Sequence, residues 1–482
     1  MSPRPLIIVL ALAFTGCAGV RKDAPPASAI QIPVGWRTSA TNGAATPSDW
    51  WTAFGDPTLN DLVEEALLHS DDVALAATHV EEARAQFRFA HAQRLPAVSL
   101  SLAGGRDRDV NPGFGNPEEQ ATGEGIVQAG FDLDLFGKLK AGSEAARSAL
   151  LASEYARDTV RLGVATSVVS GYLGLLASDA RFDVLAKTLE VRRDELRVEE
   201  ERFAAGYADR LDLVQAQGEL AATEQQIPGA QLAIARQENG LSILIGRSPG
   251  DVARGRRFGD IVVPQIPAAL PATVLRSRPD LAAAEARLAA TDHDLDAARA
   301  AFLPDIQLAV SAGQGRSSLF DHNPIGIWSL GGSILAPIFE AGRLEAQQDA
   351  AVAGRDEAAF MYRKAALQAF REVEDDLAAV ARDAEQDDAL TREHEAVERA
   401  FRISTQRYQE GYASHLDQLD AQRNLLTVEL SLVQSRLDRL IAAAGLFQAL
   451  GGGWKPQDAG ASAQRNAAGP IDTPQAVTMQ TN

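Results

Sequence analysis

The sequence predicts a mainly α-helical protein with a smaller β portion made of hairpins, in which one structural unit occurs twice. Its 482 residues are 46% apolar but only 6% aromatic, and the excess is mostly alanine and leucine, which favour long helices. Two stretches, 138–205 and 341–410, contain no proline and therefore predict unusually long helices. Each stretch follows a pair of segments in which apolar residues alternate, a pattern typical of β-hairpins.

The duplication is visible in the residues themselves. Residues 202–208 read Arg-Phe-Ala-Ala-Gly-Tyr-Ala, and 205 residues later 407–413 read Arg-Tyr-Gln-Glu-Gly-Tyr-Ala. A second pair of matches, Leu95-Pro96 and Leu303-Pro304, occurs in the same order. Matches in one order at nearly one offset indicate two copies of a unit of about two hundred residues.

In the first unit, the expected order is helix, hairpin, long helix, break and returning helix. Residues 57–96 are expected to be helical, entered through Pro57 at the first helical turn. The segment 97–137 holds the first β-hairpin. The segment 138–250 holds an αα-hairpin broken at Gly206, in which Pro228 predicts a kink of the returning helix.

The second unit repeats this order. Residues 251–304 contain a linker and a helix, and 305–340 hold the second β-hairpin. Residues 341–450 form the second αα-hairpin, broken at Gly411. Residues 451–482 lack apolar periodicity and are expected to be disordered.

The amino terminus reads as a bacterial export signal followed by a lipid attachment site. Residues 1–16 combine Arg4 with an apolar run too short to span a bilayer. Cys17, the only cysteine, follows two small residues and resembles the cysteine of a lipoprotein cleavage site. The alternative is an ordinary signal peptide with an incidental cysteine. Residues 17–56 are expected to form a lipid-anchored tether.

The composition argues against several classes of protein. The 65 acidic against 46 basic residues give a net charge of −19, which argues against a nucleic-acid partner. One cysteine excludes a disulfide framework, and the seven histidines show no metal-ligand spacing. The sequence contains no nucleophile elbow, paired acid–base site or dinucleotide fingerprint. We therefore expect no catalytic residues, no metal, no cofactor and no enzymatic activity.

The alternating segments limit how the chain can meet a membrane. They are long enough for tilted transmembrane strands, but the four expected strands are too few to close a membrane barrel. An open edge in lipid leaves backbone groups without partners. Either the hairpins are soluble or several chains pool their strands, and three chains would supply twelve.

Several features follow one another in a fixed order along the chain. They are Cys17, the segment Trp50-Trp51-x-x-Phe54-x-Asp56-Pro57-x-Leu59, the segment 131–138, and the Gly-Tyr-Ala motifs at 206–208 and 411–413. In this combination, which covers residues 10–450, the sequence resembles TolC-type outer-membrane efflux proteins of the OprM/NodT lipoprotein branch.

The resemblance implies a homotrimer in the outer membrane. A twelve-stranded β-barrel would stand above a long periplasmic α-barrel and be gated at the periplasmic tip. Such a duct passively conducts substrates that an inner-membrane pump of the RND type delivers through a periplasmic adaptor. Outer-membrane lipid would surround the barrel and hold the anchor at Cys17.

The resemblance also names candidate gate residues near the breaks at Gly206 and Gly411. Leu416, Asp417 and Asp420 match residues that narrow the tip in the family. The residues alone indicate only that Asp417 and Asp420 share a helix face, for which a solvated charged surface is the simpler interpretation. In a trimer they would form two stacked rings of carboxylates that attract cations.

Tyr408 and Asp212 match a family pair that holds the tip closed through a hydrogen bond between neighbouring helix pairs. The family's partner arginine is absent here, because its position is Ala413. The leading alternative function is a lipid-anchored periplasmic coiled-coil scaffold or adaptor without a pore. The long helices fit that alternative equally well, whereas the paired alternating segments do not.

Overall fold

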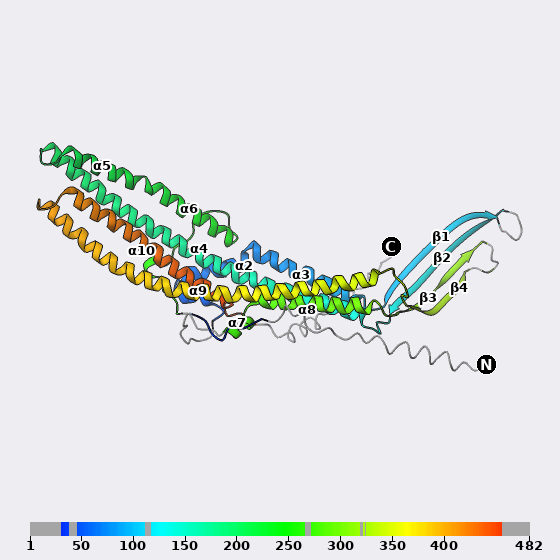
Figure 1. Cartoon of the computed structure of the whole chain (residues 1–482). Helices are drawn as coiled ribbons and strands as arrows, with labels where there is room; N and C mark the ends of the chain where they lie inside the picture. Colours follow the sequence, from blue (N-terminus) through cyan, green and yellow to red (C-terminus); the bar gives the residue numbers. More distant parts are fainter. Residues whose placement is uncertain are drawn as a thin grey trace.

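The computed structural model describes residues 30–37, 46–110, 117–265, 271–318, 322 and 324–455. The expected signal peptide and Cys17 lie outside these residues. The described chain is mainly helical and carries one antiparallel sheet of four strands. The molecule is elongated, with the sheet at one end and two helical hairpins at the other (Figure 1). This confirms the predicted fold class.

The sheet combines the β-hairpins of both repeats. Its strands pair in the order β1-β2-β3-β4, with bounds β1 (Ala97–Val110), β2 (Pro117–Asp132), β3 (Asp305–Ser317) and β4 (Ile325–Leu335). The β2–β3 pairing joins the two repeats and places Phe131 opposite Leu308. Among the described residues, β1 and β4 each have one neighbouring strand, so the sheet has two open edges.

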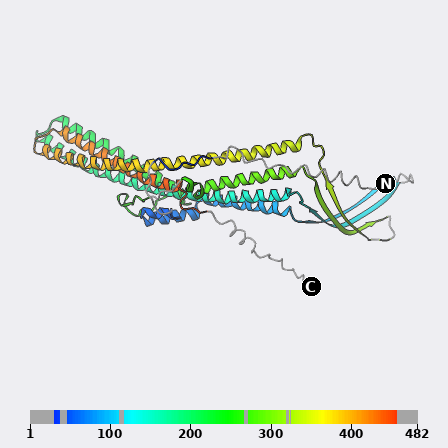
Figure 2. The same ribbon diagram turned by 60° about the horizontal axis from the view of Figure 1, so that its bottom comes forward.

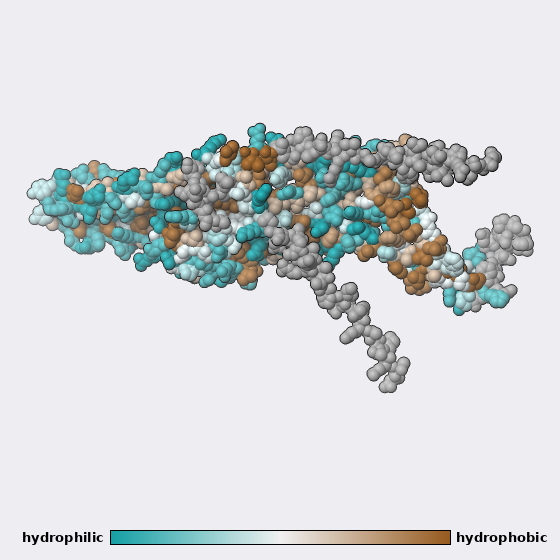
Figure 3. Space-filling view, turned by 90° about the horizontal axis from the view of Figure 1, so that it is seen from below, coloured by the Kyte–Doolittle hydropathy of each residue, from teal (hydrophilic) through white to brown (hydrophobic). Residues whose placement is uncertain are grey.

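The two faces of the sheet differ in polarity. One cross-strand row is apolar and consists of Leu100, Val127, Ala312 and Trp328. The adjacent row is polar and consists of Ser99, Gln128, Ser311 and Ser329. Successive strand residues point to opposite faces, so the two rows lie on opposite sides of the sheet. Trp328 is 80% exposed, and Figure 3 shows hydrophobic residues gathered at the strand end, whereas the helical end is mainly hydrophilic.

The helices of the first repeat are α2 (Pro57–His69), α3 (Asp71–Ala92), α4 (Lys138–Ala204), α5 (Arg210–Glu224) and α6 (Gln226–Leu244). The single helix expected over 57–96 is divided at Ser70, whose backbone is extended at ψ 131°. The returning helix is divided at Gln225. Pro228 explains this break, because it has no N–H to donate to the carbonyl of Glu224.

The helices of the second repeat are α7 (Pro271–Ser277), α8 (Pro279–Ala300), α9 (Arg343–Gln409) and α10 (His415–Ala449). Like α4, α9 contains 67 residues, which corresponds to about 100 Å of helix. Toward the sheet, α3, α4, α8 and α9 pack in that order beside one another (Figure 2). Toward the other end, α5 and α10 return along α4 and α9.

The main hydrophobic core lies midway along α4 and contains residues expected to belong to the tether. Trp50 and Phe54, from the short helix η2 (Trp50–Phe54), are fully buried, and the ring of Trp50 stacks on Phe447 at 5.2 Å. The Tyr172 hydroxyl donates to Asp56 Oδ2 at 2.8 Å. The expected tether up to residue 56 is therefore wrong for its last part, because large aromatic side chains gain more from burial than from solvation.

Among the described helices, only α4 is long and apolar enough to cross a membrane by length and composition. Of its most apolar window, 56% is buried within the structure. Val168, Val169, Leu173 and Leu175 belong to the core that surrounds Trp50. The apolar composition of α4 therefore reflects this core.

The chain after α10 does not become disordered at Gly451 as expected. The three glycines 451–453 all have positive φ, which lets the backbone pass close to Trp50 and Ser277. The Trp454 indole Nε1 then donates to Asp158 Oδ2 at 3.0 Å. The expected tail beyond residue 455 lies outside the described residues.

Candidate functional site at the helical tip

The two helical hairpins end in turns of the same geometry. Gly206 has φ +77° and Gly411 has φ +81°, values that L side chains rarely adopt. In both turns the following tyrosine N–H donates to a carbonyl five residues earlier, at 2.8 Å in each case. This is the glycine-centred end of a helix, and it explains why the Gly-Tyr-Ala motif recurs. The two turns lie together at the end farthest from the sheet (Figure 1).

The structure brings the three expected gate residues together on one exposed side of α10. Leu416 is 48% exposed, and Asp417 and Asp420 are also exposed. The buried residues of the same turns, His415, Gln418 and Leu419, face the other way. The Asp420 carboxylate lies 3.2 Å from an Arg423 guanidinium nitrogen, so part of its charge is balanced within its own helix.

Asp417 also caps the start of α10, a role that the sequence analysis did not predict. It forms a capping box with Ser414: Asp417 N–H donates to Ser414 Oγ at 3.2 Å, and Ser414 N–H donates to Asp417 Oδ2 at 3.0 Å. The hydrogen bonds from the Ser414 side chain and backbone lower the pKa of Asp417. The Ser-x-x-Asp spacing at a helix start was the signal that could have revealed this role.

Tyr408 contacts a different acid from the one that the resemblance implies. Its hydroxyl donates to Glu199 Oε1 at 2.5 Å. Among the described residues, no hydrogen bond joins Tyr408 to Asp212. Burial, followed by the hydrogen bond to Glu199, raises the pKa of Tyr408, and the charge of Asp212 adds a smaller increase. Asp212 therefore lies within electrostatic reach of the tyrosine.

Tyr408 and Glu199 belong to a buried polar cluster between the two hairpins, which we call the tip cluster. Arg192 is only 2% exposed and pairs with Glu219 at 3.1 Å and Glu195 at 3.6 Å. Gln418 Nε2 donates to Glu195 Oε1 at 3.0 Å. The full cluster consists of Arg192, Glu195, Glu199, Glu219, Tyr408, His415 and Gln418.

Burial dominates the electrostatics of the tip cluster. It lowers the pKa of Arg192, although the neighbouring Glu195 and Glu219 oppose this. It likewise raises the pKa of Glu195 against the opposing charge of Arg192. The sequence reasoning did not find this cluster, since its members come from α4, α5, α9 and α10 and share no local spacing. In the part of the chain that the structure describes, no group of three or more His, Cys, Asp or Glu side chains could hold a metal ion.

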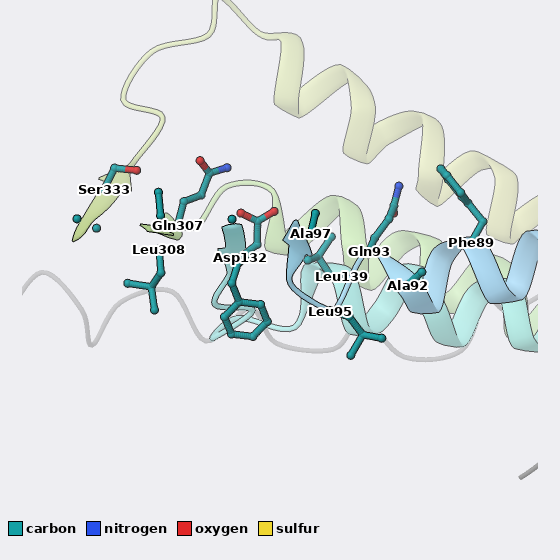
Figure 4. A pocket seen from close by; sticks show the side chains of 15 residues that line it. Phe89, Ala92, Gln93, Leu95, Ala97, Asp132, Leu139, Gln307, Leu308 and Ser333 are labelled. Carbon is teal, nitrogen blue, oxygen red and sulfur yellow. The ribbon is translucent and has the colours of Figure 1, made fainter. Parts of the chain in front are cut away.

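At the opposite end, a pocket of about 910 Å³ lies where the helices meet the sheet (Figure 4). Asp132, Gln307 and Ser333 line it and occupy one cross-strand row. Phe89 and Leu95 line it from the end of α3 and the segment that follows. This pocket therefore lies between the end of the helical part and the polar row of the sheet.

A family model described as outer membrane efflux protein matches residues 62–247 and 270–452. The two matched segments correspond to the two repeats. The pyoverdine export outer membrane protein OpmQ of Pseudomonas aeruginosa is 34% identical over 475 residues, covering 94% of this chain and 98% of that protein. The cation efflux system protein CusC of Escherichia coli O6:H1 is 32% identical over 468 residues, covering 94% of this chain and 100% of that protein.

Solved structures show the same fold. The outer-membrane channel OprN superposes with a TM-score of 0.82 at 27% identity, covering 90% of this chain and 99% of that chain. The similarity therefore extends from the strands to the helical tip. This chain belongs to the outer membrane efflux protein family, and it is an outer-membrane component of an efflux system with a long periplasmic helical part.

Proposed function

We propose that three copies of this chain form the exit duct of a tripartite efflux pump. The observation that carries the proposal is the sheet, which has four strands, two open edges among the described residues, and an apolar and a polar cross-strand row on opposite faces. A sheet of this kind satisfies its backbone in lipid only when it closes on itself. The β4 edge of one copy pairing with the β1 edge of the next would give a closed barrel of twelve strands.

In this trimer the apolar row with Leu100 and Trp328 would face lipid, and the polar row with Ser99 and Ser311 would face the lumen. This is the alternation expected of an outer-membrane barrel with a polar interior. The pocket that contains Asp132 and Gln307 would join that lumen to the periplasmic helices. Cys17 would anchor each chain to outer-membrane lipid.

The tip of the helical hairpins would be the gate. Leu416, Asp417 and Asp420 lie exposed on one side of α10, so three copies would form one apolar ring and two carboxylate rings. Closely spaced carboxylates favour a narrow passage that prefers cations. Asp212 and Tyr408 would contribute contacts that hold the tip closed.

The duct would act passively and without a catalytic step. A periplasmic adaptor and an inner-membrane pump of the RND type would deliver the substrate and supply the energy. The relatives are named for pyoverdine export and for cation efflux, so one architecture serves cargoes of different chemistry. The acidic composition argues against a nucleic-acid partner.

Planar-bilayer conductance of the purified full-length protein tests this proposal. The wild type should show a small, cation-preferring conductance, and Asp417→Asn/Asp420→Asn should raise it and weaken the cation preference. Asparagine keeps an oxygen that can accept the hydrogen bond from Ser414. The matched control is Asp375→Asn/Asp388→Asn, which removes two exposed charges of α9 away from the tip and should leave conductance unchanged.

Two outcomes would contradict parts of the proposal. If the two tip substitutions leave the conductance unchanged, the chain still forms a duct, but its gate lies elsewhere. A folded, lipid-inserted protein that never conducts would overturn the duct. Membrane extraction of Cys17→Ser separates the alternative, because a scaffold held only by its lipid would become soluble whereas a barrel would stay in the membrane.

A further inference from the structure

His415 is buried at the centre of the tip cluster. It is the first residue of α10 and only 4% exposed, and its ring lies 5.2 Å from the ring of Tyr408. Neither ring nitrogen has a hydrogen-bond partner among the described residues. A neutral imidazole tolerates this position far better than a charged one, because an ion without a partner loses its hydration on burial.

The ring is surrounded by charged groups from every helix packed against it. Glu199 is 1% exposed, and while its Oε1 accepts from Tyr408, its Oε2 has no partner among the described residues. The Arg202 guanidinium lies 4.7 Å above the Tyr408 ring. The charged and titratable groups that face His415 are Glu199, Arg192 and Arg202 of α4, Asp212 of α5 and Tyr408 of α9.

We propose that His415 is a proton-operated latch. With a neutral imidazole it holds the two helical hairpins of one chain together at the tip, and with a protonated one it lets them part and favours opening of the duct. This regulation rests on the proposed function of the tip as the gate.

The sign follows from the burial of the ring. Burial is the largest influence and lowers the pKa of His415 from its ordinary value of 6.5. The carboxylates of Glu199 and Asp212 offset this only in part, and the guanidinium groups of Arg192 and Arg202 lower the pKa further. Opening would expose the ring to water and restore a pKa near 6.5. The closed tip therefore binds fewer protons than the open tip, so acidification through pH 6.5 favours opening. With a pKa of about 6.5 in the open state, the open population rises at most about tenfold per latch by pH 5.5.

The latch belongs to the second repeat only. The equivalent position of the first repeat, 205 residues earlier, is Arg210, which is exposed. A permanently charged, solvated arginine cannot change its protonation near neutral pH. The pH response should therefore come from His415 at the contact between the hairpins, and Arg210 should contribute none.

The test is conductance of the full-length protein at pH 7.5 and pH 5.5 in the Asp417→Asn/Asp420→Asn background, in which the gate carboxylates no longer titrate. Conductance should rise on acidification, by up to tenfold for each latch. His415→Gln should abolish the rise, and His415→Phe, which keeps an aromatic ring beside Tyr408, should do the same. The matched control is His394→Gln on α9, whose side chain is 28% exposed and which should retain the full pH response.

Amide hydrogen exchange of residues 188–222 and 404–426, expressed as protection relative to His415→Gln at each pH, gives a second readout. Protection of the wild type should fall between pH 7.5 and 5.5. The latch is wrong if the wild type conducts without a pH response, closes on acidification, or responds as His415→Gln does. If no variant conducts, the duct itself is wrong, and the exchange data still decide whether His415 loosens the contact.

Discussion

The two helical hairpins of this chain end in turns of the same backbone conformation, but the side chains beside these turns differ. Gly206 and Gly411 adopt nearly the same left-handed conformation, and the hydrogen bonds that follow them have equal lengths. The side chains differ in the tip cluster beside these turns. The first repeat contributes only ionic residues, Arg192, Glu195, Glu199 and Glu219, whereas the second contributes Tyr408, His415 and Gln418. A duplicated unit can therefore preserve a turn while its side chains diverge to form a contact between the copies.

Helix capping differs between the tips for a chemical reason. Ser414 and Asp417 form a reciprocal capping box at α10, whereas Asp209 and Asp212, at the equivalent positions of α5, form none. A hydroxyl beside a carboxylate can both donate and accept, but two carboxylates can only accept and repel each other. The same aspartate position is thus a cap in one repeat and not in the other.

The tip cluster is the larger difference. Arg192, Glu195 and Glu199 of the first repeat correspond to Val397, Ala400 and Ser404 of the second, which cannot form the same ion pairs. Among the residues that the structure describes, the contact therefore occurs once, between the two hairpins. Within the described residues, α10 also runs unbroken where the first repeat has α5 and α6.

The largest effect is expected from a substitution that weakens the tip cluster. Arg192→Ala should lower the local opening free energy of the tip by about 3 kcal/mol, because Glu195 would remain buried without its cation. Arg423, which also pairs with Glu219, limits the damage. Amide hydrogen exchange of the tip measures the effect. Arg193→Ala is the control: its ion pair with Glu224 is exposed and should cost less than about 1 kcal/mol, so equal losses in both variants would contradict the importance of the cluster.

Substitution of the turn glycines should affect both repeats alike. Gly206→Ala and Gly411→Ala should each cost about 1–2 kcal/mol, because alanine is strained at positive φ. Thermal unfolding and local hydrogen exchange measure the two variants side by side. Gly218→Ala, within the exposed surface of α5 and with open space around its Cα, should instead stabilise by up to about 1 kcal/mol. A large difference between the two turn variants would show that the turns are not equivalent.

Removal of the N-cap side chains should affect the two repeats differently. Ser414→Ala should destabilise the start of α10 by about 1 kcal/mol, since it removes the acceptor of the Asp417 N–H. Asp209→Ala should change little, because the Asp209 side chain makes no capping hydrogen bond. Hydrogen exchange of the first turns of α5 and α10 reports on each helix separately. Equal losses at both helix starts would refute the distinction.

The smallest expected effect concerns pH. Hydrogen bonds from Ser414 hold the pKa of Asp417 below its ordinary value of 3.8, so its contribution to the start of α10 is complete at neutral pH. This contribution should be lost as the pH falls below 3.8 through the lowered pKa. Exchange protection of the first turn of α10, followed from pH 5 toward pH 3, should begin to fall at the acid end. Asp417→Asn, which cannot ionise, should show no such decline relative to wild type.

Local patterns made much of the fold predictable. Proline-free runs, alternating strands and the glycine before each tyrosine act within a few residues of one another, so they indicate long helices, hairpins and turns without knowledge of the partners. The division at Ser70 and the burial of Trp50 and Phe54 were not predicted. Each depends on what packs against the segment from elsewhere in the chain.

The candidate site was likewise predictable only in part. The resemblance named Leu416, Asp417 and Asp420 as candidates, because their spacing after Gly411 is a property of the sequence. The tip cluster could not be predicted in this way, because His415 lies more than two hundred residues from Arg192 and Glu199 in the sequence.

The sequence by itself thus determined the repeat, the long helices, the strands and the turns, since these follow from backbone conformation and hydrophobic periodicity. Only the tertiary structure decided which carboxylate accepts the hydrogen bond of Tyr408, and that His415 is buried without a hydrogen-bond partner among the described residues. Hydrogen bonds, desolvation and ion pairs depend on distances of a few ångströms between side chains. Such distances are set by how the helices pack, and residues far apart in the sequence carry no local signal of them.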